Sequence, residues 1–154
     1  MRPHNTLHKL AVLALLLLLL PLPARAERRT ALVIGNAAYE MGLLRNPVHD
    51  ASDMAITLRQ LGFEVTLLHD AARRPMVEGI DLFSRQLRQG GVGLFYFAGH
   101  GVQVGGENYL IPLDARIGRE QDVPYEAVPV GRILGGMEDA ENQLNIIILR
   151  CLPG

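Results

Sequence analysis

The stretch Val92-Gly-Leu-Phe-Tyr-Phe-Ala98, followed at once by Gly99-His100-Gly101, decides the fold class of this 154-residue chain. A run of seven residues without a charge predicts a strand that is buried on both faces, as at the centre of a parallel sheet. The strand ends at a histidine between two glycines. In open α/β sheets the sites form beyond the carboxyl ends of the strands, so this triplet marks a candidate site.

The segments on either side alternate between strand and helix patterns. We expect strands at Thr30–Ile34, Phe63–Leu68 and Leu144–Leu149, and helices at Asp50–Leu61, Met76–Leu87 and near Gly131–Met137. Val102–Val104 and Asn108–Ile111 flank Gly105-Gly106 and predict a hairpin, and Asp114–Val130 is expected to be a loop. This order predicts an α/β fold, a three-layer sandwich with a mostly parallel sheet covered by helices on both faces.

Composition and charge exclude several classes of protein. With 49% hydrophobic residues and a net charge of −1, the chain is neither disordered nor basic enough to bind nucleic acid or an anionic membrane surface. One cysteine excludes an internal disulfide and a multi-cysteine metal site. His49, His69 and His100 fall on separate elements without ligand spacing, so we expect no metal and no cofactor.

The first 26 residues are typical of a secretory signal peptide. Leu10–Leu20 is an apolar run shorter than the roughly 20 residues of a membrane-spanning helix, and Ala24-Arg25-Ala26 offers a cleavage site. We therefore expect a signal peptide at residues 1–26 and one domain at residues 27–154, secreted across the inner membrane to the periplasm and free of the membrane after cleavage. An uncleaved anchor is the alternative.

His100 is the first candidate for chemistry, because a general base must be both rigidly held and accessible. Its natural partner would be a thiol at the end of a neighbouring strand, since pairing with histidine lowers the pKa of a thiol and favours the nucleophilic thiolate. Cys151, which follows the last predicted strand, is the only cysteine in the sequence.

Six motifs, taken in order, resemble the caspase-like cysteine peptidases, and most closely the bacterial caspase homologues related to metacaspases. They extend from about Arg28 to Leu149 and read Ala31-Leu-Val-Ile-Gly-Asn36, Asn46-Pro-Val-His-Asp-Ala51, Leu61-Gly-Phe-Glu-Val65, Tyr96-Phe-Ala-Gly-His-Gly-Val-Gln103, Asn108-Tyr-Leu-Ile-Pro112 and Asn145-Ile-Ile-Ile-Leu149. The resemblance implies a three-layer α/β fold, a Cys–His dyad and hydrolysis of peptide bonds.

The resemblance also implies roles for single residues. His100 matches the dyad histidine, and Gly101 matches the position whose N–H helps to bind the oxyanion. Asp50 matches an acidic residue that contacts a basic P1 side chain. From its position alone, Asp50 could equally be a carboxylate that stabilises the start of a helix. Arg45 is out of step with the arginine of true caspases and is interpreted as a solvated loop charge.

The chain departs from the family at the nucleophile. The family reads Asp-Ala-Cys-Arg-Asp, whereas this chain reads Leu149-Arg-Cys-Leu-Pro-Gly154, so Cys151 comes one residue early. A one-residue slip turns a strand side chain to the opposite face of the sheet, and Cys151 should then not face His100.

One extra base near codon 150 would explain this end of the sequence. Arg-Cys-Leu-Pro-Gly can be encoded as CGA TGC CTG CCG GGA, and without the first base these codons read GAT GCC TGC CGG, which restores Asp-Ala-Cys-Arg. On this hypothesis the C-terminal part of the domain is missing. A natural short variant with a displaced cysteine is the alternative.

The function that we expect is that of a cysteine endopeptidase domain that acts on protein or peptide substrates after Arg or Lys. The chain as printed should be inactive, because its nucleophile is displaced. The alternative is a non-catalytic caspase-like domain that binds other proteins. A nucleotide-binding domain is disfavoured, because the chain has neither a GxGxxG nor a P-loop pattern.

Overall fold

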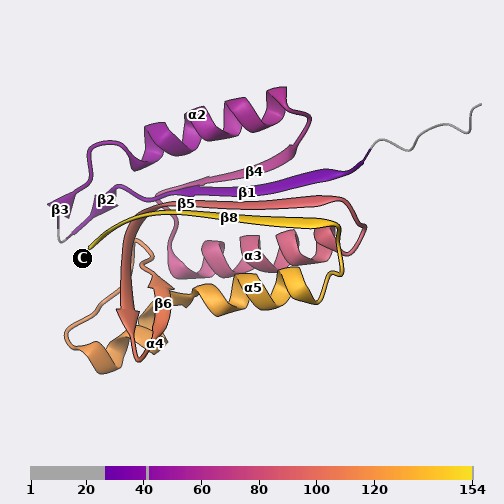
Figure 1. The fold of residues 1–154 in the computed structure, drawn as a ribbon. Helices are drawn as coiled ribbons and strands as arrows, with labels where there is room; N and C mark the ends of the chain where they lie inside the picture. Colours follow the sequence, from indigo (N-terminus) through magenta and orange to yellow (C-terminus); the bar gives the residue numbers. More distant parts are fainter. Residues whose placement is uncertain (1–26, 41, 154) are drawn as a thin grey trace, which may run out of the picture.

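The computed structural model describes residues 27–40 and 42–153 (Figure 1). The predicted signal peptide, residues 1–26, lies outside them. The strands are β1 (Arg29–Gly35), β2 (Ala38–Tyr39), β3 (Gly42–Leu43), β4 (Glu64–His69), β5 (Val92–Val104), β6 (Glu107–Leu110), β7 (Val128–Pro129) and β8 (Leu144–Pro153). The helices are α2 (Pro47–Gln60), α3 (Arg73–Leu87), η1 (Glu120–Asp122), α4 (Val123–Glu126) and α5 (Val130–Glu138).

Six of these strands form one mixed sheet. The strand order is β4-β1-β5-β6-β7, and β8 pairs with the other side of β5. β4, β1, β5 and β8 run parallel to one another, whereas β6 and β7 extend the sheet in the antiparallel sense. The predicted α/β fold with parallel long strands is confirmed.

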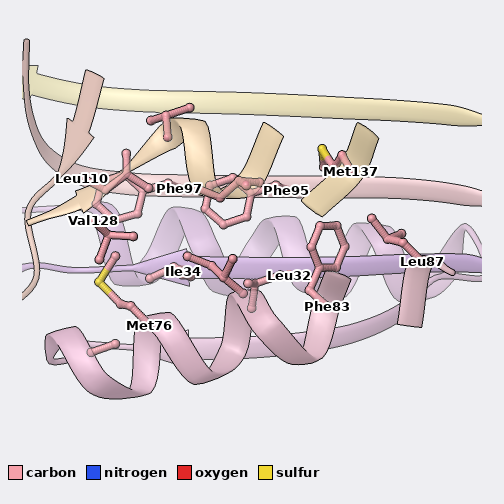
Figure 2. Close-up of a cluster of buried hydrophobic side chains, with 14 of the residues drawn as sticks. Leu32, Ile34, Met76, Phe83, Leu87, Phe95, Phe97, Leu110, Val128 and Met137 are labelled. Carbon is pink, nitrogen blue, oxygen red and sulfur yellow. The ribbon is translucent and has the colours of Figure 1, made fainter. Parts of the chain in front are cut away.

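Helices cover both faces of the sheet. Figure 1 shows α2 on one face and α3 with α5 on the other, which is the predicted three-layer arrangement. The larger core lies between the sheet and α3 and α5 (Figure 2) and includes the buried side chains of Leu32, Ile34, Met76, Phe83, Phe95 and Phe97. The α2 face buries Ala31, Val33, Leu94, Tyr96 and Ala98. Successive residues of β1 and β5 thus alternate between two cores, which explains their unbroken apolar sequence.

The glycine at the end of β1 allows α2 to approach the sheet closely. A Cβ atom on Gly35 would lie 2.5 Å from the Pro47 carbonyl oxygen and 2.6 Å from the Ala51 Cβ. Gly35 therefore serves helix packing, and it needs no ligand to explain it.

The structure differs from the predicted elements in several places. β5 and β8 continue beyond their predicted ends at Ala98 and Leu149, so His100 and Cys151 lie within strands and not after them. Val102–Val104 is not a separate strand but the end of β5, which pairs with β6 in the predicted hairpin. The expected loop at Asp114–Val130 contains η1, α4 and β7. The short hairpin of β2 and β3 was not predicted. Among the described residues, no helix is both long enough and apolar enough to cross a membrane.

Candidate functional site

His100 lies where β5 changes its neighbour in the sheet. β1 pairs with β5 as far as Ala98, and β6 begins to pair at Gly101. In the gap, the His100 carbonyl accepts a hydrogen bond from the Ile111 N–H at 3.0 Å. The His100 N–H donates to the Tyr39 hydroxyl at 3.1 Å. A side chain thus provides the acceptor that a neighbouring strand would otherwise supply.

The two glycines around His100 provide space for side chains. A Cβ atom on Gly99 would lie 2.6 Å from the Tyr39 hydroxyl oxygen and 2.8 Å from the Phe97 ring. A Cβ atom on Gly101 would lie 2.8 Å from the Cys151 sulfur. Neither glycine has a positive φ. The triplet therefore reflects close packing on both sides of His100 rather than an unusual backbone conformation.

Tyr39 is a residue of the site that sequence reasoning missed. Its ring lies edge-to-face against the His100 imidazole, with a centroid distance of 4.6 Å and an interplanar angle of 64°. Its hydroxyl also donates to the Ile111 carbonyl at 3.0 Å. Burial raises the pKa of Tyr39 to about 12, so the hydroxyl stays neutral and can donate and accept at once.

The pairing of β8 with β5 fixes the position of Cys151 relative to His100. Cys151 is the partner of Gly99, and Leu152 is the partner of His100. Because side chains alternate along a strand, Cys151 shares the face of Gly99 and Gly101, whereas His100 belongs to the other face. The structure therefore brings Cys151 beside Gly101, the candidate oxyanion position, and not to the face of His100.

The surroundings of Cys151 do not activate its thiol. The sulfur lies at a cavity of about 360 Å³ that is also lined by Gln103, Asn108 and Tyr109. Burial raises the pKa of the Cys151 thiol above its ordinary value. A raised pKa disfavours the thiolate, which is the form in which cysteine nucleophiles react.

Asp50 lies in the first turn of α2 and forms an ion pair with a residue of β8. Its carboxylate is 2.8 Å from the Arg150 guanidinium. Both side chains line a cavity of about 150 Å³ together with Arg45, Ala98 and Gly99. Asp50 thus lies in the first turn of α2, where a carboxylate can stabilise the start of the helix. It also lines a cavity beside β5. Arg45, which we expected to be a solvated loop charge, is exposed and lines the same cavity.

Two further histidines, His49 and His69, fall within the residues that the structure describes. The His69 ring is 3.1 Å from the Ser52 hydroxyl, and His49 is an exposed residue of α2. No group of three or more His, Cys, Asp or Glu side chains in the described part of the chain could hold a metal ion.

The chain matches one family model and two curated relatives. The model of the caspase domain, Peptidase C14, matches residues 28–148. The mucosa-associated lymphoid tissue lymphoma translocation protein 1 of Homo sapiens and its Mus musculus homologue are each 35% identical over 128 residues. These matches cover 80% of this chain but only 15% of each relative, so the chain spans a small part of the curated proteins that it matches.

A solved structure has the same fold. The crystal structure of protein GSU0716 from Geobacter sulfurreducens superposes with a TM-score of 0.58 at 21% identity, over 77% of this chain and 48% of that one.

Proposed function

The chain belongs to the caspase-domain family, Peptidase C14, and from this membership we propose that its active form is a cysteine endopeptidase domain in which His100 pairs with a cysteine at position 152, where the printed sequence has Leu152. The chain as printed carries its thiol at position 151 and is then catalytically silent. We place it among the bacterial caspase homologues related to metacaspases, with a periplasmic location that follows from the predicted signal peptide.

The single observation that carries the proposal is the register of β8 against β5. Position 152 pairs with His100 and position 151 pairs with Gly99. Paired residues of parallel strands direct their side chains to the same face, so a cysteine at position 152 would share the face of the imidazole. The family motif, with its cysteine one residue later than Cys151, requires this position.

The proposed reaction uses the thiolate and the imidazole in turn. His100 removes the thiol proton, and the thiolate attacks the carbonyl carbon of the scissile peptide bond. The Gly101 N–H stabilises the oxyanion that forms. The imidazolium then gives its proton to the leaving amine, and a thioester remains. Water, deprotonated by His100, hydrolyses the thioester and returns the thiol.

Asp50 would set the preference for Arg or Lys at P1. Its carboxylate faces a cavity next to Gly99, and in the printed chain it already pairs with a guanidinium, that of Arg150. This pairing supports the capacity of the cavity to take a guanidinium group, since a carboxylate is the natural partner of that cation.

A non-catalytic domain that binds other proteins is the second candidate. The raised pKa of the Cys151 thiol and its place on the face opposite to that of His100 favour it. In this case the domain folds stably and binds its partner without a catalytic dyad.

The test compares the printed chain with the double variant Cys151→Ala, Leu152→Cys and with the triple variant that adds Arg150→Asp. We expect the triple variant to hydrolyse a fluorogenic peptide with Arg at P1 faster than the double variant does. The unsubstituted chain should not hydrolyse it. Adding His100→Ala to the triple variant should abolish hydrolysis. If both variants fold and neither cleaves, the binding domain is favoured. The nucleotide sequence of codons 149–154 separately tests the extra base.

A further inference from the structure

We propose that Tyr39 is a positioning residue for His100, which it holds by its hydroxyl at the backbone and by its ring at the imidazole. The proposal rests on the proposed function insofar as His100 is the residue that transfers the proton. The contacts themselves are present in the printed chain, whether or not that chain is active.

The first observation is the gap in the sheet at His100. β5 has β1 beside it up to Ala98 and β6 from Gly101 onward. The Tyr39 hydroxyl enters this gap and accepts the His100 N–H at 3.1 Å, while it donates to the Ile111 carbonyl at 3.0 Å. One neutral hydroxyl thus ties His100 to the segment that follows β6.

The second observation is the contact between the two rings. The Tyr39 ring and the His100 imidazole lie 4.6 Å apart at 64°, an edge-to-face geometry that aromatic pairs prefer. A half-buried imidazole packed against a buried ring has fewer orientations than one on an open loop. General-base catalysis needs such a restriction, because the accepting nitrogen must stay within reach of the proton.

The third observation is that Tyr39 is itself held firmly. The Asp70 carboxylate accepts the N–H groups of Ala37 and Ala38 at 2.8 and 3.0 Å, which fixes the backbone just before Tyr39. The Tyr39 side chain is 6% exposed. The residue before His100 is a glycine whose Cβ would strike the Tyr39 hydroxyl at 2.6 Å, so the local sequence keeps that space open.

The chain offers a graded set of variants. Tyr39→Phe removes the hydroxyl and keeps the ring, and Tyr39→Leu removes both. The Ile111 carbonyl keeps the Asn36 amide as a donor at 3.5 Å, so the phenylalanine variant should fold. Tyr125→Phe is the matched control, because the Tyr125 side chain is 79% exposed.

The first experiment uses the printed chain and needs no activity. By NMR, amide hydrogen exchange at His100 should become at least tenfold faster in Tyr39→Phe, with exchange at Phe95 unchanged. The His100 ring C–H resonances should keep their positions in Tyr39→Phe and move in Tyr39→Leu, and Tyr125→Phe should change neither. If His100 exchange and ring shifts are those of the unsubstituted chain in both Tyr39 variants, the proposal is wrong.

The second experiment separates this proposal from the proposed function. In the triple variant that includes Leu152→Cys, adding Tyr39→Phe should lower kcat about tenfold and leave KM within twofold, because substrate binding does not involve the hydroxyl. The positioning role would be contradicted if Tyr125→Phe lowered kcat and thermal stability as much as Tyr39→Phe does. It would also be contradicted if Tyr39→Phe changed KM alone. If the triple variant is inactive but the NMR changes in the Tyr39 variants are as expected, the peptidase proposal is overturned and the contact of Tyr39 with His100 stands.

Discussion

The Asp50 carboxylate and the Arg150 guanidinium lie 2.8 Å apart and join the start of α2 to β8. If the cavity that they line is the P1 pocket, Arg150 already pairs with the Asp50 carboxylate that would bind a substrate arginine. The printed chain would then be blocked at this pocket as well as displaced at its thiol.

Removal of Arg150 should therefore expose Asp50 to a guanidinium ligand. We expect Arg150→Ala to bind agmatine about fivefold more tightly than the unsubstituted chain, since an ion pair of this exposure is worth up to about 1 kcal/mol. Isothermal titration calorimetry measures the change. Asp50→Asn should abolish the gain when added to Arg150→Ala, and equal affinities in all three proteins would contradict the role of Asp50.

The Cys151 thiol should react slowly with alkylating reagents. Because burial raises its pKa, a smaller fraction is thiolate at pH 7.5 than in a free thiol, and the rate should still be rising where a free thiol has reached its plateau. The rate of modification by iodoacetamide, measured from pH 7 to pH 10, gives the midpoint. A midpoint below that of glutathione would show an activated thiolate instead. Cys151→Ser supplies the background.

Two adjacent glycines of α5 should respond to alanine with opposite signs. A Cβ on Gly135 meets nothing within 4 Å, so Gly135→Ala should stabilise the protein by about 0.5–1 kcal/mol through helix propensity. A Cβ on Gly136 would lie 2.1 Å from the Ser84 hydroxyl oxygen of α3, so Gly136→Ala should destabilise it by about 1–3 kcal/mol. Urea denaturation gives both values, and the same sign for both would refute the packing of α5 on α3.

Asn36 should be essential for stability. The side chain is fully buried, its oxygen accepts the Ala71 N–H at 2.8 Å and its nitrogen donates to the Ala71 carbonyl at 3.1 Å. Asn36→Ala leaves both backbone groups without these partners, which should lower the free energy of unfolding by about 2–3 kcal/mol. Asn108→Ala, at an exposed position, should change it by less than about 0.5 kcal/mol. Similar urea midpoints for the two variants would contradict this assignment.

The long elements were predictable because their signals are local. Apolar periodicity gave the four parallel strands and the helices α2 and α3, and paired glycines gave the hairpin of β5 and β6. The face of Cys151 could also be argued in advance, because alternation along a strand depends only on its register.

The contacts of the site were not predictable, because each joins segments far apart in the sequence. Tyr39 reaches His100 from a two-residue strand with no periodicity of its own, and Arg150 meets Asp50 only after β8 has paired with β5. The packing role of Gly99 likewise depends on Tyr39. Such contacts follow from the assembled sheet and leave no pattern in neighbouring residues.

The last strand, β8, pairs with β5 along its whole length, and α5 before it is tied to α3 by the bidentate Arg132–Asp81 pair. Arg116 and Arg119 lie in the exposed segment that joins these elements to the rest of the domain. A protease that cut the chain there would leave the two pieces joined by the pairing of β8 with β5 and by the packing of Ala115 and Ile117 against a buried cluster. The two fragments should stay associated and elute together, and separate only when denatured.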